Sequence, residues 1–352
     1  MTGLTLTPEP HDDDGWWDGT PPGGALGERV GIDGVLGDLS RRAGAVRRRS
    51  PHEARGFGWD RRDGLSREWW PQGLTTSQDS GSPPPADRQV LLAGWYRRAE
   101  GKADTASRVS VVDLGPEGEP PAGRPAYEHM LLVEAADQPA AATDHSAAPT
   151  HRQVRVHAGG LAWWGTLLLV ADTRKGLRVF DLRDVVRARP GLDDASGCRY
   201  LLPQRGRWLA AADGMRPLRW SFCSLDRTSG DGVSLVAGEY SHEGTGSRLA
   251  RFTLPEGRAM PVPLRSAETL TTDIPSMQGA CRVAGTYLVS ASSGRLRRGH
   301  LWSGGPGGFH RHAGALPVGP EDLSWDATVG RLWTQTEYPG RRAVVCVPAP
   351  RG

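Results

Sequence analysis

Four acidic residues occupy comparable positions in the chain and could act together on one ligand. Asp172, Glu239 and Glu337 each end an apolar run at the same point of a recurring pattern, and Glu321 opens an equivalent stretch. Carboxylates from separate segments suit a hard divalent cation, so these four residues are candidate ligands for Ca²⁺. A cation there would polarise a carbonyl or lower the pKa of a bound water, which would support hydrolysis of a lactone or an ester.

His157 is the candidate general base for that hydrolysis. It stands directly before Ala158-Gly159-Gly160, at the start of another apolar stretch. Imidazole suits proton transfer near neutral pH, but one histidine beside glycines is also typical of a hydrogen-bonded structural residue. Paired carboxylates could instead serve glycoside hydrolysis, which depends on their separation in space.

A second group of residues near the same points of the pattern could bind a small ligand. Gln72 and Gln278 each precede a glycine, and Trp95 ends an apolar run in the first copy of the pattern. A structural role is the alternative, because acidic residues at strand ends often bond to turn backbone, and a glycine allows close backbone approach. The candidate ligand-binding residues are Gln72, Gln278, Asp226, Asp322 and Trp95.

The elements that must position these residues are short apolar runs that recur along the chain. Each copy begins with two small or polar residues followed by an apolar residue. A glycine-bounded run of apolar residues comes next, then a turn, then a second run of apolar residues. The apolar residues that align between copies are Leu74, Leu161, Leu225, Ala280 and Leu323. The shortest spacing, 43 residues between the last two, matches the four strands of one propeller blade.

This spacing predicts an all-β protein, a β-propeller of about five blades. Each sheet of such a repeat buries its faces only against neighbouring copies. A count of six blades is an alternative if residues 29–68 or 183–215 contain a degenerate copy of the repeat. The alternative fold is a pair of β-sandwich domains. In a propeller the start of the first strand and the end of the second lie on one face, so the acids, the glutamines and His157 would gather at one mouth of the channel.

Several of these motifs resemble a group of uncharacterised bacterial propeller-like proteins whose members are commonly labelled secreted. The resemblance covers roughly residues 66–349 and implies the propeller fold without an activity. The acidic set with His157 also loosely resembles calcium-dependent lactonase propellers. The motifs that carry the first resemblance are residues 70–75 (WPQGLT), 157–163 (HAGGLAW), 170–173 (VADT), 179–182 (VFDL) and 319–324 (GPEDLS).

Composition limits the classes to which the protein can belong. The chain has 352 residues with 43 basic and 40 acidic side chains, a net charge of +3, so we expect no nucleic-acid binding. Thirteen tryptophans supply apolar area for a folded core.

The chain is predicted to have two parts. Residues 1–65 are expected to form a disordered leader with a possible short helix at 32–46, and residues 66–352 the propeller. Residues 77–87 and 137–150 are predicted as loop insertions, because proline and small residues dominate them.

The start of the sequence has neither a basic nor an apolar segment, which predicts a cytoplasmic, soluble protein without a secretory signal. The resemblance points instead to an extracellular one. No apolar run is long enough for a membrane helix, so we expect no membrane insertion. The cysteines are widely spaced and suggest structural thiols: Cys198, Cys223, Cys281 and Cys346.

Two functions remain open. The first is a binding or scaffold propeller, expected as a monomer, that presents its acidic mouth to a small molecule or a protein. The alternative is the Ca²⁺-dependent hydrolase of lactonase or esterase type.

Overall fold

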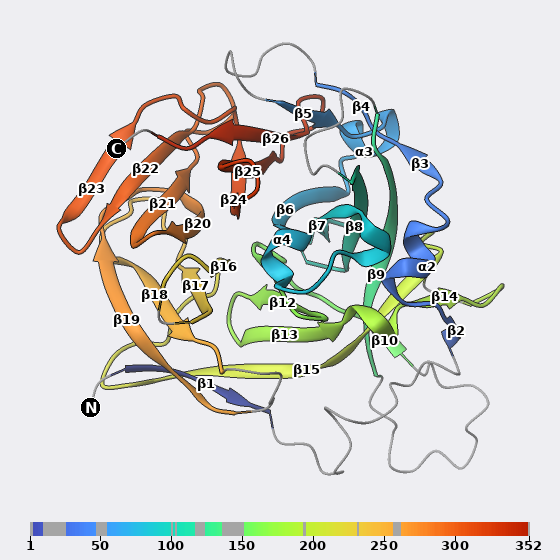
Figure 1. Cartoon of the computed structure of the whole chain (residues 1–352), viewed down its shortest axis with the longest axis horizontal. Helices are drawn as coiled ribbons and strands as arrows, with labels where there is room; N and C mark the ends of the chain where they lie inside the picture. Colours follow the sequence, from blue (N-terminus) through green and yellow to red (C-terminus); the bar gives the residue numbers. More distant parts are fainter. Residues whose placement is uncertain are drawn as a thin grey trace.

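The computed structural model describes residues 3–9, 26–46, 55–99, 101–102, 104–116, 124–135, 151–192, 195–230, 232–255 and 262–350. These residues form five antiparallel blades around a centre (Figure 1), which confirms the predicted propeller. The inner strands contact one another in the order β6, β11, β16, β20, β24 and back to β6. The inner strands of each blade therefore pack against those of its two neighbours.

The five blades are each built from four strands, ordered below from the inner to the outer strand. Blades 1 to 3 are β6 (Trp69–Thr76), β7 (Gln89–Arg97), β8 (Ser107–Gly115), β9 (Ala126–Ala135); β11 (Leu161–Trp164), β12 (Leu167–Asp172), β13 (Gly176–Asp181), β15 (Tyr200–Asp213); β16 (Phe222–Asp226), β17 (Ser234–Gly238), β18 (Ser247–Thr253), β19 (Leu264–Thr272). Blades 4 and 5 are β20 (Met277–Val283), β21 (Thr286–Ala291), β22 (His300–Gly305), β23 (Gly308–His312); β24 (Pro320–Asp326), β25 (Arg331–Thr336), β26 (Ala343–Pro348), β5 (Arg55–Gly58).

The outer strand of blade 5 comes from the amino-terminal part of the chain. Phe57 pairs with Val344 of β26, and β4 (Gly44–Ala45) pairs in turn with β5. The ring is therefore closed by strands far apart in sequence. A side chain at Gly56 would prevent this pairing, because a Cβ atom there would lie 2.0 Å from the backbone oxygen of Val344.

The prediction that residues 1–65 form a disordered leader needs correction for the described residues of this segment. Its described residues pair with the blades, since β1 (Gly3–Pro8) pairs with β15 and β19, and β3 (Arg41–Arg42) pairs with β9. The predicted boundary after residue 65 therefore lies within the propeller. The helix predicted at 32–46 is α2 (Gly31–Leu36), which is shorter because strands follow it. Residues 10–25 and 47–54 of the leader lie outside the described part.

The other short elements connect or cover the blades. They are β2 (Gly27–Arg29), α3 (Arg61–Leu65), η1 (Pro85–Asp87), β10 (His151–Gln153), η2 (Leu182–Asp184) and β14 (Val186–Ala188). Residues 183–215 supply β14 and the outer strand of blade 2, not a sixth blade. The insertion predicted at 77–87 contains a helix, α4 (Ser77–Ser80), while 137–150 lies outside the described residues.

The core lies between neighbouring blades. Trp95, Trp333, Phe57 and Tyr127 are fully buried in one cluster that joins blades 1 and 5. Burial of each such side chain stabilises the fold by about 1.5–3 kcal/mol. The four cysteines are buried as well, and no disulfide links them. Among the described residues, no helix combines the length and apolar character that a membrane crossing requires.

The centre of the ring is tightly packed. Asp322 of β24 accepts hydrogen bonds from the backbone N–H of Leu74 (3.1 Å) and Leu161 (3.2 Å), and so joins blade 5 to blades 1 and 2. A Cβ atom at Gly279 would lie 2.5 Å from Cα of Asp322, so the close approach requires glycine. Helix α4 contacts the inner strands β6, β11 and β24 and lies over the centre in Figure 1.

Candidate functional site

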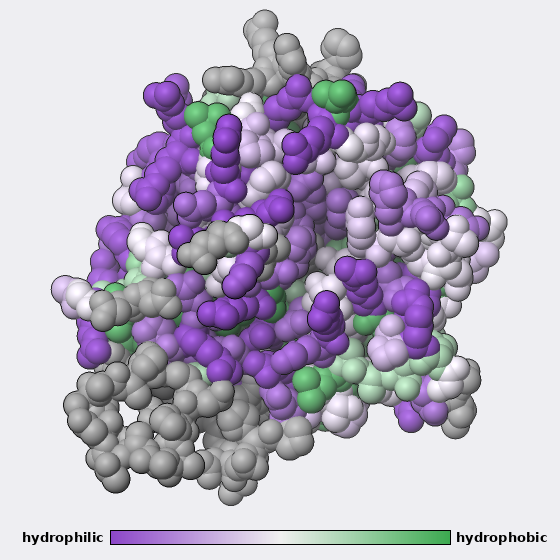
Figure 2. Space-filling model, turned by 180° about the vertical axis from the view of Figure 1, so that it is seen from behind, coloured by the Kyte–Doolittle hydropathy of each residue, from purple (hydrophilic) through white to green (hydrophobic). Residues whose placement is uncertain are grey.

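A pocket of about 540 Å³ lies where the first strands of the blades begin. Seen from behind Figure 1, the molecule shows mostly hydrophilic side chains around its centre (Figure 2). The pocket is formed by residues of all five blades. They are Gln72, Tyr96, Asp104, Arg155, Val156, His157, Asp172, Thr173, Arg174, Lys175, Arg178, Arg219, Ser221, Tyr240, Gln278, Glu321 and Glu337.

The structure brings six of the predicted site residues to this one pocket. They are Gln72, His157, Asp172, Gln278, Glu321 and Glu337. Three of them lie at irregularities of strand pairing, in equivalent places of three blades. The register shifts between Pro71 and Leu74, between Met277 and Gly279, and between Pro320 and Leu323. A bulge re-aims the side chain of the bulged residue, which explains how inner-strand residues line the mouth.

Glu321 is the most buried carboxyl group of the pocket. The residue is 2% exposed, and its carboxyl group has no hydrogen-bond partner among the residues that the structure describes. Burial raises the pKa of Glu321 well above its usual value, and the neighbouring Glu337 and Asp322 add to the effect. Burial also raises the pKa of Glu337. Glu321 is therefore a carboxylic acid that can hold its proton at a higher pH than an exposed glutamate.

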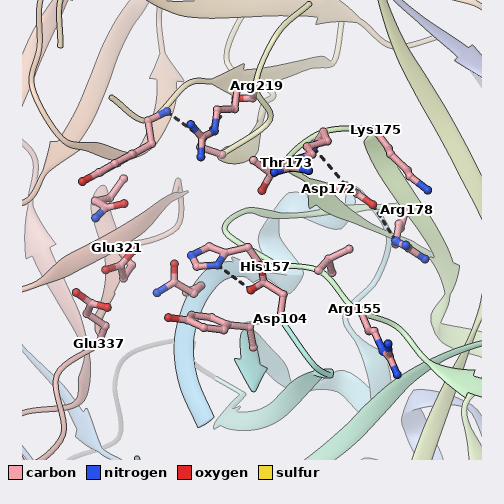
Figure 3. A pocket seen from close by; sticks show the side chains of 17 residues that line it. Asp104, Arg155, His157, Asp172, Thr173, Lys175, Arg178, Arg219, Glu321 and Glu337 are labelled. Carbon is pink, nitrogen blue, oxygen red and sulfur yellow. Dashed lines mark hydrogen bonds and ion pairs between the residues drawn. The ribbon is translucent and has the colours of Figure 1, made fainter. Parts of the chain in front are cut away.

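His157 lies in the middle of the pocket and is held on two sides. Its Nδ1 atom donates to Oδ1 of Asp104 at 3.0 Å, and its ring stacks on Tyr96 with 4.2 Å between centroids. In Figure 3 the second ring nitrogen points to the side of the pocket where Glu321 and Glu337 lie. Because Nδ1 carries the proton that bonds Asp104, Nε2 of the neutral ring is free to accept a proton.

The opposite side of the pocket is basic. Figure 3 places Lys175, Arg178 and Arg155 there, across from Glu321 and Glu337. Asp172 lies on this side, and Nε of Arg178 donates to its carboxylate at 3.1 Å. The negative charge of Asp172 is therefore compensated within the protein.

The remaining predicted residues lie away from this pocket. Glu239 is held by Arg216 and Arg248 at 2.7 and 2.8 Å and lines a smaller adjacent cavity of about 350 Å³. Asp226 forms an ion pair with Arg282 at 2.8 Å, and Asp322 occupies the packed centre. Trp95 is fully buried and donates to Ser110 Oγ at 2.8 Å.

The four predicted metal ligands do not converge into one set. Asp172 and Glu239 are engaged by arginines in separate places, which leaves Glu321 and Glu337 as the only two of the four that lie on the same wall. Among the described residues, no group of three or more His, Cys, Asp or Glu side chains has a geometry that could hold a metal ion. The Ca²⁺ site therefore stays a prediction from the sequence.

Some residues of the pocket were missed at the level of sequence. Tyr96, not Trp95, faces the pocket, because neighbouring residues of a strand point to opposite faces. The alternation along β7 was the signal that could have identified it. Asp104 comes from the connection between β7 and β8, where no pattern marks it.

Comparisons with solved structures find distant likenesses. No model of a protein family matches the sequence, and no curated protein matches it. A GH43_1 enzyme from Xanthomonas citri is 12% identical with a TM-score of 0.41, covering 82% of this chain and 90% of that chain. A gluconolactonase from Xanthomonas campestris is 12% identical with a TM-score of 0.36, over 89% and 86%. A glutaminyl cyclase from Myxococcus xanthus is 12% identical with a TM-score of 0.34, over 89% and 100%.

Proposed function

We propose that the protein binds a small polar molecule in the central pocket and hydrolyses it by acid–base catalysis. The observation that carries this proposal is the pairing of two different groups across one pocket. Glu321 is a buried carboxyl with a raised pKa and no hydrogen-bond partner within the described part of the chain, and His157 is oriented by Asp104 with its Nε2 turned to the same side. A proton donor and a proton acceptor on one pocket are the two groups that such hydrolysis requires.

Each group has a defined part in the reaction. Neutral Glu321 donates its proton to the leaving oxygen of the substrate, while Nε2 of His157 removes a proton from the attacking water. The carboxylate of Asp104 stabilises the imidazolium that forms. Glu337 favours the protonated form of Glu321, because two neighbouring carboxyl groups do not readily ionise together. Proton exchange with solvent returns both groups to their starting states.

The experiment is a hydrolysis screen with small chromogenic glycosides, esters and lactones, run on the wild type and on Glu321→Gln and His157→Asn. We expect each variant to lose about 10²- to 10⁴-fold in kcat. Glu243→Gln is the matched control, since Glu243 is exposed and outside the pocket. Equal rates in wild type and Glu321→Gln would remove Glu321 from the mechanism.

The second candidate is a propeller that binds the same kind of molecule without converting it. Uncharged hydrogen-bonding groups favour it, since Gln72, Gln278, Ser221 and Tyr240 reach the pocket from three blades and from the segment before blade 3. Saturable binding of a compound that the protein does not convert would support this candidate over the first.

A further inference from the structure

The two sides of the central pocket differ in charge. Glu321 and Glu337 lie on one side, and the cations Lys175 and Arg155 lie on the other (Figure 3). His157 lies between them. A substrate that fills the pocket therefore contacts an acid at one end and cations at the other.

The cations of the pocket are free to bind a ligand. Within the described part of the chain, four basic side chains of the pocket form no ion pair and no hydrogen bond: Arg155, Arg174, Lys175 and Arg219. Arg178 differs, because its guanidinium group is held by Asp172, Glu134 and Gln204. Because Asp172 is already compensated by Arg178, it does not neutralise the other four.

The backbone that carries these cations is held in place. In the turn from β12 to β13, the backbone N–H of Lys175 donates to the backbone carbonyl oxygen of Asp172 at 3.1 Å. The backbone carbonyl oxygen of Thr173 accepts from the backbone N–H of Trp220 at 3.1 Å. Arg219 N–H donates to the buried carboxylate of Glu239 at 2.9 Å. The turn and the segment before β16 are thus tied together, and they present Lys175 and Arg219 from a fixed frame.

We propose that the molecule bound in this pocket carries an anionic group, a carboxylate or a phosphoryl group, which one of the two cations Arg219 and Lys175 binds, with the other and Arg155 and Arg174 adding to the positive field. This inference rests on the proposed function, since it identifies the substrate class of the same site. The uncharged end of the substrate lies between Glu321 and His157. Arginine suits both anions, because its planar N–H groups match their oxygens. The buried acidic side disfavours the reverse orientation.

The test is calorimetric titration of the full-length protein with D-glucuronate, D-glucose 6-phosphate and neutral D-glucose. We expect one of the two anions to bind at least about tenfold more tightly than glucose, and added salt to weaken that binding. Glucuronate alone would identify a carboxylate, and glucose 6-phosphate alone a phosphoryl group. Binding of glucose as tight as that of both anions, or no saturable binding of either anion, would overturn the proposal.

Variants localise the binding. Of Arg219→Gln and Lys175→Gln, the variant that removes the cation bound to the anion should weaken anion binding about tenfold, since it removes one charged contact. Arg265→Gln is the matched control, because Arg265 is exposed on β19 and does not line the pocket. Unchanged anion affinity in both pocket variants would place the anion elsewhere and overturn the proposal.

A further variant separates this inference from the proposed function. Glu321→Gln should keep the anion affinity while it loses turnover. Anion binding without hydrolysis of any anionic or neutral compound would refute the proposed function alone. Faster hydrolysis of a neutral glycoside than of its glucuronide and 6-phosphate counterparts would refute the anionic substrate and leave the acid–base function standing.

Discussion

Nδ1 of His157 lies 3.0 Å from Oδ1 of Asp104, across 53 residues of sequence. Asp104 comes from the connection between two strands of blade 1, whereas His157 precedes the first strand of blade 2. The contact therefore depends on how these two blades sit against each other. It determines which nitrogen of His157 carries the proton, and with it the direction in which the ring can act as a base.

Asp104→Asn should lower kcat by about 10²-fold with little change in KM, because an amide no longer stabilises the imidazolium. In the proposed mechanism Asp104 is a positioning residue, so the pH profile of kcat should change as well, which a purely structural role would not cause. Asp33→Asn is the control, since Asp33 is exposed on α2. An unaltered kcat and pH profile would contradict the prediction.

Glu321→Gln should remove the alkaline limb of the pH profile of kcat/KM. In the proposed mechanism the wild type needs the protonated acid, so its rate should fall as the pH rises through the raised pKa of Glu321. The variant should keep only a low residual rate, without that limb. Steady-state kinetics across the pH range measure this, and an alkaline limb that persists in the variant would assign it to another group.

The same substitution should stabilise the protein at alkaline pH. Between the unfolded and the folded pKa of Glu321, the native state binds more protons than the unfolded chain, so wild-type stability falls as the pH rises through this window. The loss is about 1.4 kcal/mol for each unit of pKa difference. Urea melts at two pH values should show that the gain of the variant is larger at the alkaline one. An equal gain at both values would contradict the raised pKa.

Gly56→Val should weaken closure of the ring, because its Cβ atom would meet the Val344 oxygen at 2.0 Å. We expect a loss of at least about 1–3 kcal/mol in the free energy of unfolding, measured by urea melts. Gly305→Ala is the control, since no atom lies within 4 Å of an added Cβ there. Equal stability of the two variants would show that pairing of β5 with β26 is dispensable.

Calcium should leave the melting midpoint of the wild type unchanged relative to chelator, because the four predicted ligands do not meet. A specific ion bound to the folded state would raise the midpoint by mass action. A rise that Glu321→Gln or Glu337→Gln abolishes would restore the Ca²⁺ hypothesis at this wall.

The sequence by itself determined the repeat, the five blades and the mouth at which polar residues gather. These follow from local periodicity: apolar runs at blade spacing predict the strands, and antiparallel order predicts which strand ends share a face. Gln72, Gln278, Glu321 and Glu337 could be assigned to one mouth on that basis.

Only the tertiary structure decided which of the acids remain available. Asp172 and Glu239 occupy equivalent strand ends to Glu337, yet arginines on the next strand compensate both. The pairing of β5 with β26 and the contact of Asp104 with His157 likewise join distant segments. Periodicity gives the direction of a side chain along its own strand, whereas its charge partner and its burial depend on the segments that pack against it. That packing separates a carboxylate compensated by arginine, such as Asp172, from a buried carboxyl group with a raised pKa, such as Glu321.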